Sequence, residues 1–393
     1  MKITQTKDIR AANRWEIMRL VLGRWPISRA DIGRRTGLNK ATVSTIVKEW
    51  LDAGLLRETE LGPSEGGRKP ILLKPRAEAG CALALDLDIR RVGAILTGLS
   101  GEKVLAREQF AIGEPDFPQV YGQLCQAVDR LLHRMPQSRY GLVGMGVAVH
   151  GVVDLSGLIR FIPRLGWRNV DLRSLLEERY QVPVYLDNDG NLAALAQQEL
   201  MEGGEGQPYQ SLAVVNIGES ISAGFITQGE VLRGFHGFAN AIGHHTINFD
   251  EPVRCSCGKF GCWEQYCSDS AVIAYANSVL PRPIATLEEL VELIRHQDPV
   301  AKQVMDRFLT YLAVGLTNII FIFDCQAVAV SSELLSALPY YLPEILGKMV
   351  LPITHMEKVE LSRLGKSGAI LGAAHQAACQ FFQDLANQGE TTG

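Results

Sequence analysis

The sequence lacks the features of a membrane-spanning, secreted or disordered protein. Its most apolar window, Tyr311–Val330, contains Asn318 and Asp324, so it fits a core helix leading into a buried strand better than a membrane span. Residues 1–10 are polar and have no apolar segment of the kind found in signal peptides. Hydrophobic residues make up 47% of the 393 and charged residues 21%, which excludes a disordered or fibrous chain. We expect a cytoplasmic protein of two to three globular domains, with no membrane partner.

Neither sign of charge dominates the whole chain, but the charges are unevenly distributed. The net charge is −4. Residues 1–76 carry 16 Lys and Arg against 8 Asp and Glu, net +8, and the remainder carries 23 against 35, net −12. A basic segment ahead of an acidic body is typical of a polyanion-binding module joined to a domain that does not bind polyanions. Charge alone does not decide whether that polyanion is nucleic acid.

The basic segment has the pattern of a helix-turn-helix. A first helix is expected from residue 8 to about residue 23, and a second over residues 29–35 with Ser28 as its N-cap. Gly37 supplies a turn, and Asn39 can cap a third helix. One face of that helix is apolar: Val43, Ile46, Val47, Trp50 and Leu51. Its opposite face and leading edge hold hydrogen-bonding and cationic residues: Lys40, Thr42, Ser44, Thr45 and Lys48. Such side chains reach bases and phosphates from a major groove, and a solvated polar face is the alternative.

The next residues have the pattern of a β-wing. Two short strands, 55–60 and 71–74, flank a tip rich in glycine and proline. Arg68 and Lys69 follow two glycines, which suits insertion of a cation into a narrow minor groove; a flexible charged loop is the alternative. Helix, turn, helix and wing in this order predict a winged helix-turn-helix domain over residues 1–76, with double-stranded operator DNA as its partner.

The rest of the chain contains an internal duplication. Three strands of a β-meander are expected twice, over residues 81–88, 91–99 and 104–110, and over residues 211–217, 222–227 and 230–234. A helix and a strand follow each meander: 119–135 and 140–150, then 301–323 and 327–331. The repeat predicts an α/β body of two halves, 77–200 and 201–393, with the actin-like, sugar-kinase-like (ribonuclease H-like) architecture. Such a body binds its ligands in the cleft between the halves.

Four of the eight cysteines lie within residues 255–267. In a reducing compartment such clustering favours a metal over disulfides, and three thiolates with one imidazole complete a tetrahedral zinc shell. The predicted ligands of a structural Zn²⁺ are His244, Cys255, Cys257 and Cys262. Cys267 or His245 could replace one of them, and free thiols or a redox switch are the alternatives.

With these motifs the chain resembles, along essentially its whole length, the ROK family of bacterial sugar kinases and winged-helix repressors of sugar genes. Residues 244–264 are similar to the family signature Gly-His followed by Cys-x-Cys-Gly-x-x-Gly-Cys-x-Glu, and residues 186–191 are a second match. The resemblance supports the four zinc ligands and implies these sugar-binding residues: Asn188, Asp189, His244 and Glu264. In the family's kinases the residue in the place of Asp189 is the general base. Without the resemblance, Asp-Asn-Asp between a strand and a helix also fits a simple helix cap.

The turns that phosphoryl transfer needs are altered. Residues 86–90, Asp-Leu-Asp-Ile-Arg, replace the kinases' Asp-x-Gly-Gly-Thr, and Glu219 would repel phosphate in the second turn, 218–224. A third position, usually rich in glycine, has Val-Ser-Ser-Glu over residues 330–333. We therefore expect no enzymatic activity.

Sugar recognition also departs from the family pattern. Ala241 replaces a usual glutamate, Arg164 a usual asparagine, and His150 a common proline. Because buried hydroxyls without partners bind at a cost, the effector is either not a plain hexose or bound weakly. Arg164 would suit an acidic sugar if it points into the cleft, and otherwise it lies at the solvent edge.

Together these patterns predict a transcriptional regulator of sugar-utilisation genes, of the repressor type. We expect it to bind an inverted repeat as a homodimer and to respond to a sugar or sugar derivative. The alternatives are a ROK sugar kinase with an appended DNA-binding module and a repressor for which zinc itself is the signal.

Overall fold

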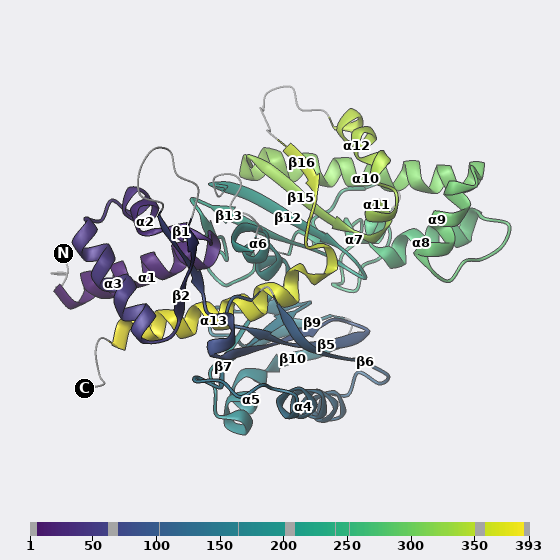
Figure 1. Ribbon diagram of the computed structural model, residues 1–393. Coiled ribbons are helices and arrows are strands. Elements are labelled where there is room, and N and C mark those ends of the chain that lie inside the picture. Colours follow the sequence, from purple (N-terminus) through teal and green to yellow (C-terminus); the bar gives the residue numbers. More distant parts are fainter. Residues whose placement is uncertain are drawn as a thin grey trace.

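The computed structural model describes residues 6–61, 70–101, 103–163, 165–200, 209–239, 241–250, 252–349 and 358–388. These residues form an N-terminal domain and an α/β body of two halves (Figure 1). The N-terminal domain contains three helices, α1 (Thr6–Gly23), α2 (Arg29–Thr36) and α3 (Lys40–Asp52). Its sheet has the order β1-β3-β2, with bounds β1 (Ile27–Ser28), β2 (Leu56–Leu61) and β3 (Ile71–Pro75).

The predicted helix-turn-helix is confirmed, and its caps are the residues expected from the sequence. The Ser28 side chain accepts a hydrogen bond from the backbone N–H of Asp31, and the Asn39 side chain accepts one from that of Thr42. Gly37 has a φ of 70°, the left-handed conformation that ends α2 and starts the turn. On α3, Val43, Ile46, Val47 and Trp50 are buried, whereas Leu51 is half-buried.

The two strands of the wing pair in antiparallel fashion, with Leu56 opposite Pro75 and Glu58 opposite Leu73. The tip, residues 62–69, lies outside the described residues, so Arg68 and Lys69 remain sequence-based predictions.

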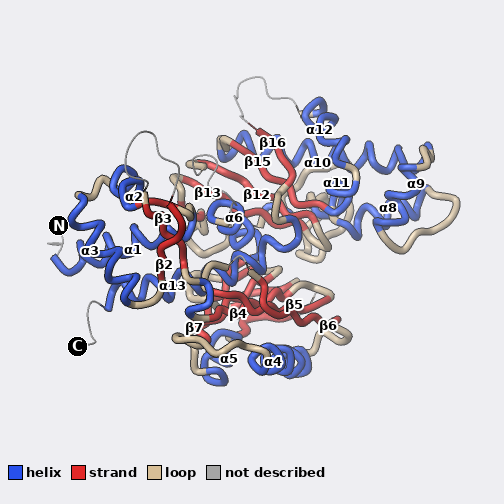
Figure 2. Tube along the Cα trace, in the orientation of Figure 1, coloured by secondary structure: helices blue, strands red, loops and turns tan. Residues whose placement is uncertain are grey.

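The first half of the body is built on a five-stranded sheet of order β11-β7-β4-β5-β6. Its strands are β4 (Cys81–Leu87), β5 (Arg91–Gly98), β6 (Val104–Ala111), β7 (Leu142–Val149) and β11 (Val184–Asn188). Two helices, α4 (Phe117–His133) and α5 (Leu172–Tyr180), cover one face of this sheet (Figure 2). A small sheet beside it contains β8 (Val152–Val153), β9 (Ile159–Ile162) and β10 (Trp167–Val170).

The second half repeats this arrangement, with the order β14-β13-β12-β15-β16. Its strands are β12 (Ser211–Ile217), β13 (Ile221–Thr227), β14 (Glu230–Val231), β15 (Ala327–Ser332) and β16 (Lys358–Leu361). In each half the first strand of the meander pairs antiparallel with the second strand and parallel with the strand after the helix. The duplication predicted from the sequence is thus present in the topology. Strand β14 is shorter than the predicted 230–234.

The helices of the second half form its outer layer. They are α7 (Glu264–Cys267), α8 (Asp269–Val279), α9 (Leu287–Arg295), α10 (Pro299–Phe323), α11 (Glu333–Ala337) and α12 (Leu342–Lys348). Among the described residues, α10 is the one helix long and apolar enough to cross a membrane by length and composition. Its buried residues, such as Leu309, Leu312 and Leu316, belong to the core of the second half. The apolar window therefore forms a core helix followed by the buried strand β15, as the sequence indicated.

Two helices, α6 (Asp189–Glu199) and α13 (Gly368–Gln388), lie between the two sheets (Figure 1). Here the structure differs from the division at residue 200, because α13 packs on the sheet of the first half. A Cβ at Gly146 of β7 would lie 1.9 Å from the carbonyl oxygen of Ala373, and one at Gly372 would lie 2.0 Å from that of Leu192 on α6. Helix periodicity marks an apolar face but not the sheet that this face covers.

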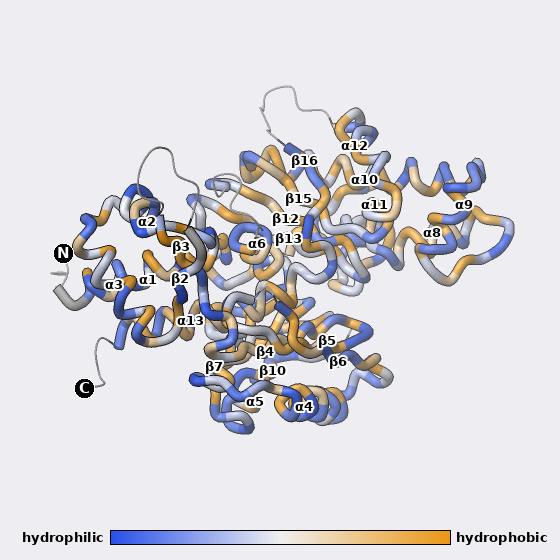
Figure 3. The backbone as a smooth tube through the Cα atoms, in the orientation of Figure 1, coloured by the Kyte–Doolittle hydropathy of each residue, from blue (hydrophilic) through white to orange (hydrophobic). Residues whose placement is uncertain are grey.

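The N-terminal domain packs against the C-terminal part of α13. A single apolar cluster joins residues of α1 and α3, such as Met18 and Trp50, to Val143 of β7 and Phe382 of α13. The Trp50 and Phe382 rings meet edge to face with centroids 6.4 Å apart. Figure 3 shows hydrophobic colouring along these helices and the central strands. The N-terminal domain therefore shares an apolar core with the body.

Candidate metal centre and effector cleft

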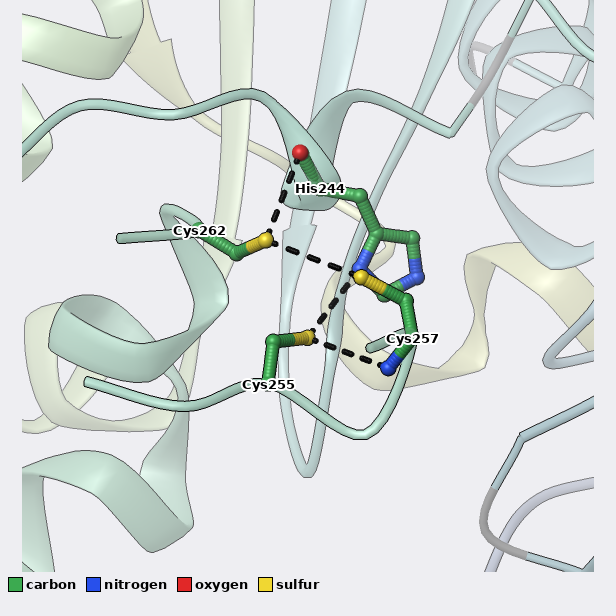
Figure 4. Close-up of side chains that lie close together, drawn as sticks. All are labelled: His244, Cys255, Cys257 and Cys262. Atoms are coloured by element: carbon green, nitrogen blue, oxygen red, sulfur yellow. Dashed lines mark hydrogen bonds between the residues drawn. The ribbon is translucent and has the colours of Figure 1, made fainter. Parts of the chain in front are cut away.

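Three cysteines and one histidine of the second half lie together, with two of the cysteines buried and the other two residues half-buried (Figure 4). His244 ends the 3₁₀ helix Ile242–His244, and Cys255, Cys257 and Cys262 lie on the loop that leads to α7. One ligand atom from each of the four side chains lies within 4.8 Å of the others. The Sγ atoms of Cys257 and Cys262 are 3.7 Å apart, and Nδ1 of His244 is 3.5 Å from Sγ of Cys255. A set of three sulfurs and one imidazole nitrogen fits a closed tetrahedral site for a soft divalent cation.

The two substitute ligands considered from the sequence do not join this cluster. Cys267 is fully buried and directs its Sγ toward the carbonyl oxygen of Phe308. The ring of His245 faces the carbonyl oxygen of Ile242 and the amide of Asn318. Burial raises the pKa of the Cys262 thiol, so a nearby cation is required for it to act as a thiolate ligand at neutral pH.

Glu264 connects the cluster to the cleft between the halves. It is the first residue of α7, and its Oε1 lies 3.0 Å from Sγ of Cys255 and 3.5 Å from Nδ1 of His244. His244 and Glu264 also line an inner cavity of about 60 Å³ together with Asn188 and Asp189. The cluster of three cysteines and His244 therefore adjoins one wall of this cavity.

Asn188 and Asp189 lie where β11 passes into α6. The Asn188 side chain accepts a hydrogen bond from the Gly190 N–H, and its amide donates to the carbonyl oxygen of Gly151 at 2.9 Å. It is thus a helix cap as well as a lining residue of the cavity. Asp189 is buried and accepts a hydrogen bond from the Ser222 hydroxyl, while the amide of Asn216 lies 3.5 Å away. Burial raises the pKa of Asp189.

His150 occupies the centre of the cleft, directly after β7. Its Nε2 lies 2.9 Å from Oδ1 of Asp86, and its Nδ1 lies 3.7 Å from both Asp88 and Asp189. Burial alone would lower the pKa of His150, but the carboxylates of Asp189, Asp86 and Asp88 raise it to about 10. Sequence reasoning noted His150 as a departure from the family but did not assign it to the site. The signal available in the sequence was a histidine at the end of a strand. That strand, β7, lies parallel to β4, which carries Asp86.

The altered turns line a second, outer cavity of about 280 Å³. Arg90 from the β4–β5 turn and Glu219 from the β12–β13 turn form a 3.1 Å ion pair from one half to the other. Lys366 also lines this cavity, and it pairs with Glu333 and lies 3.7 Å from Asp269. Charged side chains therefore occupy the turns where the family's kinases have glycines.

On α3, the predicted DNA-contacting residues face away from the core. Lys40, Thr45 and Lys48 are exposed, and Thr42 and Ser44 are half-buried. Arg164, the residue considered for an acidic sugar, lies outside the described residues.

The fold and the cleft define a class of protein in which a helix-turn-helix domain is joined to a two-lobed, sugar-kinase-like body. Within that class, the sequence matches the ROK family over residues 82–379, and the chain belongs to this family. The resemblance inferred from the motifs is thereby confirmed.

The curated relatives match both parts of the chain. The chain is 31% identical over 377 residues to the xylose repressor of Bacillus subtilis, covering 95% of this chain and 96% of the relative. It is 30% identical over 390 residues to the xylose repressor of Bacillus spizizenii, covering 98% and 99%. It is also 26% identical over 348 residues to the transcriptional dual regulator NagC of Escherichia coli, covering 86% and 84%.

Solved structures support the fold. A ROK family transcriptional regulator, a homologue of the E. coli Mlc protein, superposes with a TM-score of 0.76 at 23% identity, covering 96% of this chain and 99% of that one. A ROK family glucokinase from Streptomyces griseus superposes with a TM-score of 0.64 at 24% identity, covering 79% and 100%. The regulator match extends over nearly the whole chain, whereas the kinase match leaves a fifth of it uncovered.

Proposed function

We propose that the protein is a DNA-binding transcriptional repressor of sugar-utilisation genes that responds to a sugar. The observation that carries this proposal is the match to xylose repressors over 95% or more of this chain, which includes the helix-turn-helix as well as the body. The capped α2 and α3, with Lys40 and Lys48 exposed, provide the surface that a major groove requires. Operator DNA as partner implies a cytoplasmic protein.

The effector site is the inner cavity lined by Asn188, Asp189, His244 and Glu264. These side chains offer amide, carboxylate and imidazole groups, the partners that sugar hydroxyls need when they leave water. D-xylose is the first ligand to test, because the relatives named above are xylose repressors.

We infer that the body is not a kinase. Glu219 lies in the turn that would hold phosphate, and its pair with Arg90 spans the two halves. A carboxylate at this place repels the charge that phosphoryl transfer must stabilise.

His244, Cys255, Cys257 and Cys262 would hold a structural Zn²⁺. Bound there, the ion would join the loop before α7 to the 3₁₀ helix that carries His244, and so keep the cavity wall in place. The donor set has no ligand position left for a substrate.

The protein acts as a homodimer on an inverted repeat. One winged helix buries little DNA, and a two-fold dimer doubles the contact. Sedimentation in the presence of operator DNA tests this, and a strictly monomeric protein with undiminished affinity contradicts it.

A titration of operator DNA with and without D-xylose, D-glucose and N-acetylglucosamine tests the repressor proposal. We expect one sugar to lower operator affinity while chelation of zinc unfolds the body instead of switching it. Release by zinc alone would support a metal-responsive repressor, and sugar-dependent turnover of ATP in a coupled assay would support a kinase. Operator binding that no sugar alters contradicts the sugar effector.

A further inference from the structure

His150 is positioned between the two cavities of the cleft and lines both of them. One side of its ring is fixed, because Nε2 contacts Asp86 at 2.9 Å. The other side is not. Nδ1 lies 3.7 Å from Oδ1 of Asp88 and 3.7 Å from Oδ2 of Asp189, which is too far for a direct hydrogen bond to either carboxylate.

The three carboxylates around this ring favour the form of His150 that has a proton on each nitrogen. Asp86 and Asp88 come from β4 and its turn, and Asp189 comes from α6. The other cations that line the outer cavity each have a carboxylate partner. Arg90 pairs with Glu219, Arg91 lies 3.5 Å from Asp88, and Lys366 pairs with Glu333. Within the described part of the chain, His150 is therefore the cation that lies beside Asp86 and the buried Asp189.

The gap between Nδ1 of His150 and the carboxylates of Asp88 and Asp189 fits one chemical group of a ligand, a hydroxyl. A hydroxyl can accept from the Nδ1–H and donate to a carboxylate at the same time, whereas a methylene or an ether oxygen can do at most one of these. Ser222 and Asn216 both donate to Oδ2 of Asp189 and so orient its carboxylate, which leaves Oδ1 as the acceptor for this role.

We propose that His150 is the specificity-determining residue of the cleft, and that it recognises one hydroxyl of the sugar by bridging that hydroxyl between Nδ1 and Asp189. This inference rests on the proposed sugar effector. It assigns to His150 a direct contact with the ligand, and it makes Asp189 a binding group in place of a catalytic base.

The test is a set of calorimetric titrations of D-xylose and each of its monodeoxy derivatives. Wild type, His150→Gln and the control His133→Gln are compared; His133 is an exposed histidine at the end of α4, in the same half. For wild type and His133→Gln we expect one deoxy derivative to bind roughly 10- to 100-fold more weakly than D-xylose, the loss of a hydrogen bond to a charged group. In His150→Gln that ratio should fall below about 3-fold.

A second measurement needs no ligand. Imidazole ¹⁵N spectra of wild type at pH 7.5 should show His150 protonated on both nitrogens, with the His150 signals assigned by their loss in His150→Gln.

These outcomes separate the two proposals. If wild type binds D-xylose and His150→Gln keeps the full discrimination against the same deoxy derivative, the role of His150 is wrong and the sugar effector stands. A neutral His150 at pH 7.5 also overturns its role, whatever the variants bind. If wild type binds neither D-xylose nor any other sugar tested, the sugar effector fails and the bridging role fails with it.

Discussion

At the scale of single residues, the cleft is a place where opposite charges are paired. His150 contacts Asp86, Arg90 contacts Glu219 across the two halves, and Asp187 contacts Arg233 at 2.8 Å. Where the pair is largely shielded from solvent, as for His150 and Asp86, removing one member leaves the other uncompensated, which costs more than the pair itself contributes. Stability should therefore depend on the protonation of these groups.

The titration of His150 should contribute to the pH dependence of the free energy of unfolding. A base whose pKa is higher in the folded state stabilises the fold fully below its unfolded pKa of 6.5 and loses that contribution as the pH rises through about 10. We expect the free energy of unfolding of wild type to fall between pH 6.5 and 10 by up to a few kcal/mol more than that of His150→Gln. Urea unfolding of both proteins across this range measures the difference. Parallel profiles would contradict the assignment, because thiols and other groups titrate equally in the two proteins.

The cysteine cluster gives a second prediction at this scale. Cys257→Ser or Cys262→Ser should lower the zinc content and the melting temperature, because three ligands hold the ion less tightly than four. Metal analysis and thermal unfolding measure both effects. Cys125→Ser, a buried cysteine of α4 outside the cluster, is the control and should keep its zinc. Full metal content in both cluster variants would contradict the site.

At the scale of elements, local signals in the sequence were sufficient for the helices and strands but not for their partners. Ser28, Gly37 and Asn39 act within four residues of their own positions, so the turn and its caps could be predicted. The contact between Asp86 and His150 spans 64 residues and depends on the parallel pairing of β4 with β7. No local pattern contains that information, and the same is true of the return of α13 to the first sheet.

Helix α3 should divide its contacts with DNA between bases and phosphates. Lys48 is exposed and lies two turns along the helix, so Lys48→Ala should weaken binding to all sequences alike and reduce the salt dependence. Ser44→Ala should instead change which bases are preferred, with each good contact worth about 1–3 kcal/mol. Titrations of operator variants at two salt concentrations distinguish the two effects. A change of base preference in Lys48→Ala would reverse this assignment.

At the scale of the whole molecule, one helix runs from the cleft between the halves to the N-terminal domain. Helix α6 begins at Asp189 in the cleft and ends at Glu199, whose carboxylate accepts from Arg19 of α1 at 3.0 Å. Arg19 also donates to Glu230 of β14 at 2.9 Å. The N-terminal domain is thus held by an ion pair at the end of the same helix that lines the cavity.

Loss of Arg19 should weaken the packing of the N-terminal domain on the body without unfolding that domain. Surface ion pairs contribute about 1 kcal/mol or less, so Arg19→Met should raise hydrogen exchange in α1 several-fold and leave the body unchanged. Arg10→Met is the matched control, because Arg10 pairs with Glu49 inside the N-terminal domain. Equal exchange at the surface between α1 and α13 in both variants would contradict a role of Arg19 in docking.

The position of α13 has a consequence for the synthesis of the protein. The helix-turn-helix and the first sheet leave the ribosome early, but the apolar faces that both present to α13 stay uncovered until residues 368–388 have been made. Residues 189–367 therefore separate the last strand of the first sheet from the helix that covers this sheet, and such distant contacts form late. A chain that stops before α13 lacks the helix against which its N-terminal domain packs. A prematurely terminated product therefore cannot position that domain on the body, as operator binding would require.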